Sequence, residues 1–211
     1  MRVDLADADS FLAELPPASV DAIVTSPPYA GLPGRGDVDT LDLVDIVLYH
    51  APRILNDGGE LALIVGATEG RPTLPFDVAQ RVAGSAYGLR GFYVWDRTDA
   101  FHQRRVVDQV QTHDYVIHTT VHGVIAPLWP SSVIRTTMPA FDYGRGKTTP
   151  PDLAALLVNA TTRQGCLVVD PFAGLAEIGV QAVSSGRRFA GCDIDEHLVD
   201  LANARLEAAA R

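Results

Sequence analysis

Short apolar runs alternate along the chain with longer segments whose apolar residues recur at helical spacing. The apolar runs predict strands at residues 21–26, 60–66, 89–97, 110–120, 166–172 and 187–195. The amphipathic segments predict helices at residues 41–55, 76–88, 150–161, 177–186 and 196–210. The sequence "NDGG" at residues 56–59 is expected to end the first of these helices.

Strands that alternate with helices of this length predict an α/β fold, with a mostly parallel sheet covered by helices on both faces. Continuous apolar strands fit burial on both sides. Residues 89–97 and 110–120 differ, because a loop rich in arginine joins them directly. They predict an antiparallel strand pair at one edge of the sheet. No repeat or linker interrupts the pattern, so residues 1–211 are expected to form one domain.

Polar side chains end three of the predicted strands, at Ser26, Asp170 and Asp193. In open α/β sheets, ligands bind at the carboxyl ends of the strands. The sequence therefore predicts that the functional site lies where these three strands end.

The two later strand ends predict a nucleoside-type cofactor site. Small residues after Asp170 (Ala173, Gly174 and Ala176) let the backbone approach a ligand, and a helix follows them. Roughly twenty residues later, Asp193 is suited to accept both hydroxyls of a ribose, while Asp195 is suited to cap the next helix. The structural alternative is a packing corner followed by a helix-capping acid.

The first strand end predicts the chemistry. In "TSPPY", Pro28 has no N–H, so the loop after Ser26 is stiff and cannot continue a strand ladder. The Ser26 hydroxyl and the Pro27 carbonyl can then accept both protons of a planar amine, and Tyr29 can stack on its ring. A Pro-Pro turn with a packed tyrosine is the alternative.

These motifs resemble those of a known family. "TSPPY" followed downstream by "DPFAG" is similar to the amino-methyltransferases that alkylate exocyclic nitrogens of DNA bases with S-adenosylmethionine. The catalytic motif precedes the cofactor motif, which resembles the permuted β-type order of that family. The stretches "ELPPASVDAIVTSPPY", "ILNDGGELALIVG", "TTPPDLAALLVNATTRQGCLVVDPFAG" and "GRRFAGCDIDEHLVDLANARL" extend the resemblance over most of the chain.

The resemblance implies a Rossmann-like class I methyltransferase fold, with a catalytic half at residues 1–120 and a cofactor-binding half at residues 148–211. It implies direct methyl transfer, without a metal, by a loop formed of Ser26, Pro27, Pro28 and Tyr29. The residues expected at the S-adenosylmethionine site are Asp170, Phe172, Ala173, Gly174, Ala176, Glu177 and Asp193, with Thr149 a weaker candidate. Serine at the first motif position favours cytosine N4 over adenine N6.

The cofactor turn departs from the family pattern at Leu175-Ala176-Glu177, where the family usually continues Gly-Ser-Gly-Thr-Thr. Ala176 adds a methyl group where the backbone is expected to meet the ligand. Glu177 has three interpretations: a favourable first-turn acid, a group that grips the cofactor's ammonium, or a change that weakens binding. An inactive homologue is a further interpretation of the same departure.

The variable insert, at about residues 118–147, is shorter than an ordinary recognition domain. Its candidates for contacts with a base or phosphate are Trp129, Phe141, Tyr143, Arg145 and Lys147. The net charge of −9 also argues against a general affinity for duplex DNA. A basic loop contains His102, Arg104 and Arg105, for which plain solvent exposure is the favoured interpretation, and His113 is expected to be structural.

The expected activity is methylation of cytosine N4 in DNA. The alternatives are the same chemistry on RNA, a free nucleoside or another small amine, and a non-catalytic subunit with the same fold. A homodimer or a separate specificity protein could supply further DNA-binding surface. No apolar run reaches the length of a membrane helix and no secretory signal is visible, which predicts a cytoplasmic protein with two buried thiols, Cys166 and Cys192; a disulfide is the alternative.

Overall fold

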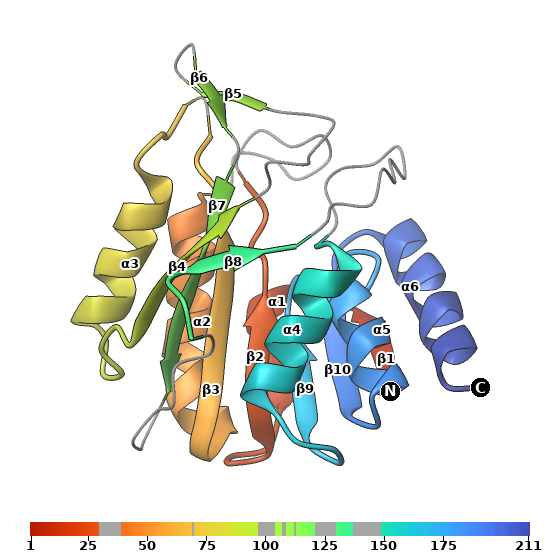
Figure 1. Cartoon of the computed structure of the whole chain (residues 1–211). Helices are drawn as coiled ribbons and strands as arrows, with labels where there is room; N and C mark the ends of the chain where they lie inside the picture. Colours follow the sequence, from red (N-terminus) through yellow and green to blue (C-terminus); the bar gives the residue numbers. More distant parts are fainter. Residues whose placement is uncertain are drawn as a thin grey trace.

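The computed structural model describes residues 1–29, 39–68, 70–96, 104–106, 109–111, 113–120, 130–136 and 149–211. Its centre is a twisted eight-stranded sheet in the order β1-β10-β9-β2-β3-β7-β4-β8 (Figure 1). The strands are β1 (Arg2–Leu5), β2 (Val20–Thr25), β3 (Leu55–Val65), β4 (Gly91–Asp96), β7 (His113–Thr120), β8 (Val133–Arg135), β9 (Leu167–Asp170) and β10 (Arg188–Asp193).

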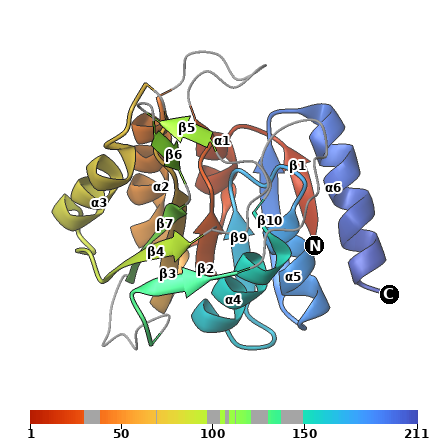
Figure 2. The same cartoon turned by 45° about the horizontal axis from the view of Figure 1, so that its top comes forward.

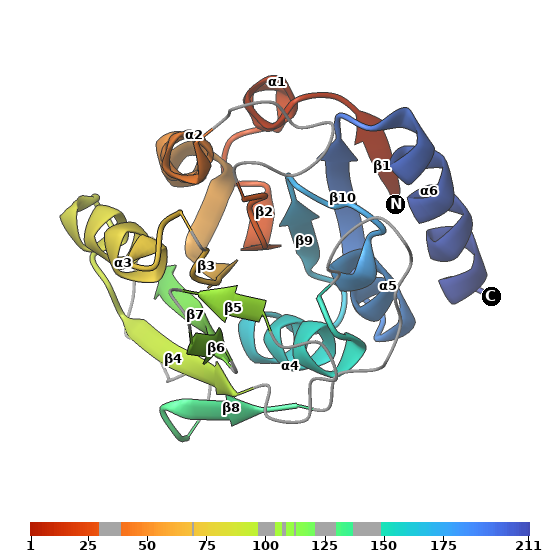
Figure 3. The same ribbon diagram turned by 90° about the horizontal axis from the view of Figure 1, so that it is seen from above.

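Helices cover both faces of this sheet, as the sequence predicts (Figure 3). One face carries α1 (Ala8–Glu14), α2 (Thr40–Ile54) and α3 (Leu74–Gly84). The other carries α4 (Pro151–Thr161), α5 (Glu177–Ser184) and α6 (Glu196–Ala209). Each layer has its own core cluster: Leu12, Val47 and Val78 lie in the first, and Leu157, Ala182 and Leu206 in the second. Because both faces are buried, the central strands read as continuous apolar runs.

The predicted antiparallel pair is confirmed. Strand β7 runs antiparallel to both neighbours: its Tyr115 lies opposite Val94 of β4, and its Ile117 lies opposite Leu63 of β3. The pair is not the edge itself, because β8 lies beyond it, parallel to β4. This strand belongs to the predicted variable insert, yet Ile134 is fully buried in the core. Part of the insert is thus a component of the sheet.

The "NDGG" segment does not separate a helix from a strand. Helix α2 ends at Ile54, and β3 begins at the next residue. The register with β2 shifts from Val20–Leu55 to Ala22–Glu60, so residues 56–59 form a bulge. Gly58 has a φ of +81°, a conformation that glycine adopts without strain.

Several short elements could not be predicted from the hydrophobic periodicity. The sequence did not predict β1, α1, β8 or β5 (Arg104–Val106). Strand β5 forms a separate hairpin with β6 (Gln109–Gln111), which overlaps the start of the strand predicted at residues 110–120. This hairpin lies between β4 and β7 in the chain and projects beyond the end of the sheet at which β7 begins (Figures 1 and 2). Each of these elements has seven residues or fewer, too few to display a clear period.

The two cysteines are free thiols. Cys192 is buried as predicted, whereas Cys166 is only partly buried. In the part of the chain that the structure describes, every helix is too short or too polar to cross a membrane.

Candidate active site

Three neighbouring parallel strands bring Ser26, Asp170 and Asp193 to the same edge of the sheet. Strand β9 pairs with β10 on one side and with β2 on the other (Figure 3). Parallel strands end on the same side, so residues far apart in the chain become neighbours here. The arrangement of strand ends predicted from the sequence is therefore present, with β2 preceding β9 in the chain.

Asp170 is a buried carboxyl group bound by the neighbouring strand β2 and by the turn that follows it. Its Oδ1 atom accepts a hydrogen bond from the Thr25 hydroxyl at 2.6 Å and another from the Phe172 N–H at 3.0 Å. Burial raises the pKa of Asp170 to about 7, and the neighbouring Asp193 adds to the shift, while the two hydrogen bonds oppose it. A cation placed beside this carboxyl would favour its ionised form.

Asp193 joins the end of β10 to the turn after β9. Its Oδ2 atom accepts a hydrogen bond from the Gly174 N–H, and its Oδ1 atom accepts one from the Asp195 N–H, both at 3.0 Å. Asp195 caps α6 through the N–H groups of His197 and Leu198, as predicted. The two acids therefore have separate contacts, and of the two only Asp193 borders the cavity beside these strand ends.

The turn after Asp170 is compact and mostly buried. Gly174 and Ala176 both have left-handed backbones, with φ of +52° and +54°. Ala176 is 0% exposed and packs in the core on the α4–α6 face, so its methyl group does not face the open edge. The sequence-based expectation placed this methyl group between backbone and ligand, whereas in the structure it packs in the core.

Glu177 has structural partners that the sequence did not suggest. Its Oε2 atom forms an ion pair with Arg205 of α6, and its Oε1 atom accepts a hydrogen bond from Gln181 at 2.9 Å. Arg205 also donates to the Leu175 carbonyl at 2.5 Å. Both carboxylate oxygens of this 8%-exposed residue are thus bound within the protein, and they tie the turn to α6.

The Ser26–Tyr29 loop is held by side-chain and backbone contacts at three points. The Ser26 hydroxyl donates to the Ile64 carbonyl at 3.2 Å, and the Tyr29 hydroxyl accepts from the Gly66 N–H at 2.7 Å. Between them, the Pro28 carbonyl accepts from the Thr40 hydroxyl at 3.0 Å. A serine whose proton is donated elsewhere presents its lone pairs to other donors. Ser26 is thereby set up as an acceptor.

A mostly apolar cavity of about 170 Å³ opens beside the strand ends. Four predicted site residues line it: Pro28, Tyr29, Phe172 and Asp193. The remaining lining residues are Ala6, Asp7, Ala8, Asp9, Leu43, Ile46, Pro171 and Ile194. The other predicted residues do not border it: Ser26, Pro27, Thr149, Asp170, Ala173, Gly174, Ala176 and Glu177.

The start of α1 forms part of the cavity wall, and sequence reasoning did not identify it. Asp7 caps this helix by accepting the Ser10 N–H at 2.9 Å, and this bond lowers the pKa of Asp7. Asp9 contacts His50 of α2 at 2.7 Å. Asp is a preferred N-cap residue and Asp9 adds an acid in the first turn, so the pattern "DADS" could have revealed the start of this helix.

Other predicted candidates belong to other elements of the fold or lie outside the described residues. Thr149 precedes α4, and His113 bonds to the Tyr115 hydroxyl at 3.0 Å, in keeping with a structural histidine. Arg104 and Arg105 lie on β5. The candidates outside the described residues are His102, Trp129, Phe141, Tyr143, Arg145 and Lys147.

The chain is similar to known DNA methyltransferases. Residues 145–204 match the family model described as DNA methylase, N6_N4_Mtase. The Type II methyltransferase M.XycI of Xanthomonas campestris pv. cyanopsidis is 23% identical, over 95% of this chain and 86% of that protein. The DNA adenine methyltransferase YhdJ of Escherichia coli (strain K12) is 24% identical, over 96% and 81% of the two chains.

Solved structures share the fold. TTHA0409 of Thermus thermophilus, in complex with S-adenosyl-L-methionine, aligns with a TM-score of 0.76 and 24% identity, covering 99% of this chain and 95% of that one. The cytosine-N4-specific PvuII DNA methyltransferase aligns with a TM-score of 0.79 and 17% identity, covering 96% and 85%. The class I methyltransferase fold and the family resemblance predicted from the motifs are confirmed.

Proposed function

We propose that this relative of the N6/N4 DNA methylases is an S-adenosylmethionine-dependent methyltransferase that acts on the exocyclic amine of a DNA base, with cytosine N4 as the target. The observation that carries the proposal is the position of Ser26. Ser26 directly follows β2, the strand that pairs with β9 and so lies beside Asp170. Its hydroxyl donates to the Ile64 carbonyl of β3, so its oxygen is available to accept an amine proton.

The residues at the strand ends fit the proposed cofactor. The cavity has an apolar lining with Phe172 and Ile194, which suits an adenine ring, and Asp193 at its wall suits the hydroxyls of a ribose. Asp170 lies on the adjacent strand, where a carboxylate suits the cationic part of the molecule. The cofactor supplies an electrophilic methyl group. The protein has to bind the cofactor, orient the amine and exclude water.

The Ser26–Tyr29 loop orients the amine. Hydrogen bonds from the amine to Ser26 Oγ and to the Pro27 carbonyl favour a more tetrahedral, nucleophilic nitrogen, since they draw its lone pair out of conjugation with the ring. Positioning supplies much of the rate in such a transfer. A base in duplex DNA has to be flipped out of the stack to reach this loop.

The choice of cytosine N4 rests on Ser26, because serine at this position is commoner among the cytosine-N4 enzymes that the motif resembles. The PvuII enzyme is cytosine-specific, whereas YhdJ is an adenine methyltransferase, so both target classes are found among similar proteins. DNA is the proposed partner. A homodimer or a specificity protein would add contact surface.

The net charge of −9 favours a second candidate with the same chemistry on a substrate that carries few phosphates, such as a nucleoside. Such a substrate needs no recognition domain. An acidic protein that methylates long duplexes requires a local basic surface, and a nucleoside methylase does not.

Calorimetric titration with S-adenosylmethionine and S-adenosylhomocysteine tests the cofactor site first. We expect micromolar binding that Asp193→Ala weakens and that Asp200→Ala, on the exposed surface of α6, leaves unchanged. Methyl transfer is then measured on duplexes that contain only G·C pairs or only A·T pairs, with the methylated base identified, and on free nucleosides. Absence of binding would overturn the enzyme proposal, and transfer to adenine alone would overturn the target assignment.

A further inference from the structure

The Ser26–Tyr29 loop depends on residues of α2 and of the segment after β3. Thr40, the first residue of α2, is 2% exposed and donates its hydroxyl proton to the Pro28 carbonyl at 3.0 Å. The Gly66 N–H, directly after β3, donates to the Tyr29 hydroxyl at 2.7 Å. Two consecutive loop residues are thereby attached to two different elements. The loop can keep one geometry only if those elements keep a fixed distance.

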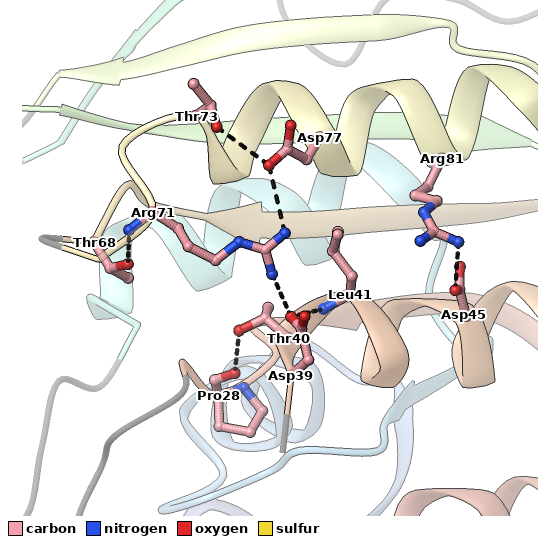
Figure 4. Close-up of polar contacts among 10 residues, drawn as sticks. All are labelled: Pro28, Asp39, Thr40, Leu41, Asp45, Thr68, Arg71, Thr73, Asp77 and Arg81. Atoms are coloured by element: carbon pink, nitrogen blue, oxygen red, sulfur yellow. Dashed lines mark hydrogen bonds and ion pairs between the residues drawn. The ribbon is translucent and has the colours of Figure 1, made fainter. Parts of the chain in front are cut away.

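Arg71 connects those two elements (Figure 4). Its Nη1 atom lies 2.5 Å from Oδ1 of Asp39, which caps α2 by accepting the Leu41 N–H at 3.0 Å. Its backbone N–H donates to Thr68 Oγ1 at 3.0 Å and closes the turn after β3. Arg71 therefore joins the start of α2, which carries Thr40, to the segment that begins at Gly66.

The same guanidinium also contacts α3. Nη2 of Arg71 lies 3.6 Å from Oδ2 of Asp77, an oxygen that also accepts the Thr73 hydroxyl at 3.3 Å. Figure 4 shows Arg71 reaching from its turn toward Asp39 on one side and Asp77 on the other. A guanidinium suits this position, because its planar donors can bind two carboxylates at once.

We propose that Thr40 and Arg71 are positioning residues for methyl transfer, which hold the Pro28 carbonyl and the Tyr29 hydroxyl in register so that Ser26 and Pro27 face the amine correctly. The proposal rests on the proposed function, and it assigns a role to residues outside the motifs. Thr40 acts directly on the loop, and Arg71 acts through Asp39 and the turn after β3. A displacement of about 1 Å at such a site can lower the rate roughly a hundredfold.

An ion pair that joins α3 directly to α2 provides the matched control. Nη1 of Arg81 on α3 lies 2.7 Å from Oδ2 of Asp45 on α2, and this pair is similarly half-exposed (Figure 4). It joins α2 to α3 but contacts neither the Ser26–Tyr29 loop nor the turn after β3. If ion pairs between these helices matter only for stability, Arg71→Met and Arg81→Met should behave alike.

The first readout is hydrogen exchange of the Gly66 amide, measured by NMR in the full chain, with the Val168 amide in the core as the reference. The variants are Thr40→Val, Thr40→Ser, Arg71→Met and Arg81→Met. We expect exchange at Gly66 to accelerate about fivefold or more in Thr40→Val and Arg71→Met, as after loss of one hydrogen bond. Thr40→Ser keeps the hydroxyl, and Arg81→Met leaves the contacts of Arg71 in place. Exchange at Gly66 in both variants should therefore match the wild type.

The second readout is the kinetics of methyl transfer by the same variants. We expect Thr40→Val to lower kcat on the order of 10- to 100-fold and Arg71→Met to lower it less, with the Kd of S-adenosylmethionine unchanged. Thr40→Ser should restore most of kcat. Equal losses of kcat in Arg71→Met and Arg81→Met would overturn the positioning role of Arg71.

The amide measurement decides the proposal even if the protein methylates nothing. Unchanged exchange at Gly66 in both Thr40→Val and Arg71→Met would overturn it, because the loop would then be held without them. If the wild type has no methyltransferase activity, accelerated exchange in these two variants would still support the attachment of the loop and count against the proposed function alone. Should Thr40→Val fail to fold, Arg71→Met supplies the test, since its side chain is 34% exposed.

Discussion

The Thr25 hydroxyl donates a 2.6 Å hydrogen bond to Oδ1 of Asp170, although 145 positions separate the two residues in the chain. This bond joins the last residues of β2 and β9, the strands that lead into the loop proposed for catalysis and the turn proposed for cofactor binding. It places an uncharged donor beside a carboxyl group that has little access to water. The ionisation of Asp170 therefore offers a direct test of how this junction is built.

Asp170 should make the protein less stable as pH rises. With its pKa raised to about 7 from 3.8, the folded protein holds a proton between these values that the unfolded chain has released. Its contribution to the free energy of unfolding is therefore present in acid and lost as pH rises through 7. Between pH 4 and pH 8, this group should lower the free energy of unfolding of the wild type by on the order of a few kcal/mol. Asp170→Asn has no carboxyl group at this position and should lack that decrease.

Thermal unfolding at several pH values checks this prediction. The melting temperature of Asp170→Asn should rise relative to the wild type as the pH increases, because the amide stays neutral and can still accept from Thr25. Asp200→Asn, on the exposed surface of α6, serves as the control and should follow the wild type. Parallel pH curves for wild type and Asp170→Asn would contradict the buried, neutral carboxyl.

Much of this junction was predictable from the sequence. The runs "DAIVTS", "CLVVDPF" and "RRFAGCDID" each have an apolar centre, which favours buried parallel strands, and each ends near a polar residue of the site. The alternation of strands and helices then places those ends at one edge. The fold and the meeting of Ser26, Asp170 and Asp193 follow from local patterns and one topological rule.

The partners of the site residues were not predictable, because they depend on tertiary contacts. Nothing in the sequence pairs Glu177 with Arg205, which lies on another helix, or Thr40 with Pro28. Ala176 combines complete burial with a left-handed φ that alanine rarely adopts, and no local sequence pattern indicates either feature. The start of α1 was missed because a seven-residue helix shows too little periodicity.

Binding of S-adenosylmethionine should release a proton near neutral pH. If the cationic part of the cofactor lies by Asp170, as proposed, it favours the carboxylate, whose pKa of about 7 in the free protein then falls. Affinity should decrease below pH 7, by up to about tenfold per pH unit. Calorimetry in two buffers of different ionisation enthalpy measures the released proton. A binding enthalpy independent of the buffer at pH 6 would contradict this coupling.

The ion pair of Glu177 with Arg205 should contribute more to the stability of the fold than to the affinity for the cofactor. Arg205→Met leaves a buried carboxylate with only Gln181 as a charge-neutral partner, at a cost of about 1–3 kcal/mol in the free energy of unfolding. Urea denaturation measures this loss, and Arg163→Met on the exposed surface is the control. A tenfold weaker affinity for S-adenosylmethionine in Glu177→Gln, without loss of stability, would instead assign Glu177 to the cofactor.

Gly66→Ala should disturb the Ser26–Tyr29 loop. A Cβ atom at this position would lie 2.0 Å from Oδ1 of Asp114 and 3.1 Å from the Tyr29 hydroxyl, so one of these groups has to move. Overpacking of this kind costs about 1–3 kcal/mol. Gly70→Ala in the same loop is the control, because its Cβ would meet no atom within 4 Å. Equal activity and melting temperature in the two variants would show that Gly66 has room after all.

Ser26→Ala should abolish most methyl transfer and leave the fold intact. The substitution removes the acceptor proposed for the amine, together with one 3.2 Å bond to the Ile64 carbonyl on β3, a strand that β2 and β7 pair on both sides. The melting temperature should therefore change little, and the affinity for S-adenosylmethionine should stay, because Ser26 does not line the cavity. Single-turnover kinetics at saturating cofactor isolates the transfer step, for which we expect a loss on the order of 100-fold or more.

Ser19→Ala, whose hydroxyl bonds only the Pro16 carbonyl at an exposed turn, is the matched control. Full transfer by Ser26→Ala would remove the residue on which both the mechanism and the choice of cytosine depend.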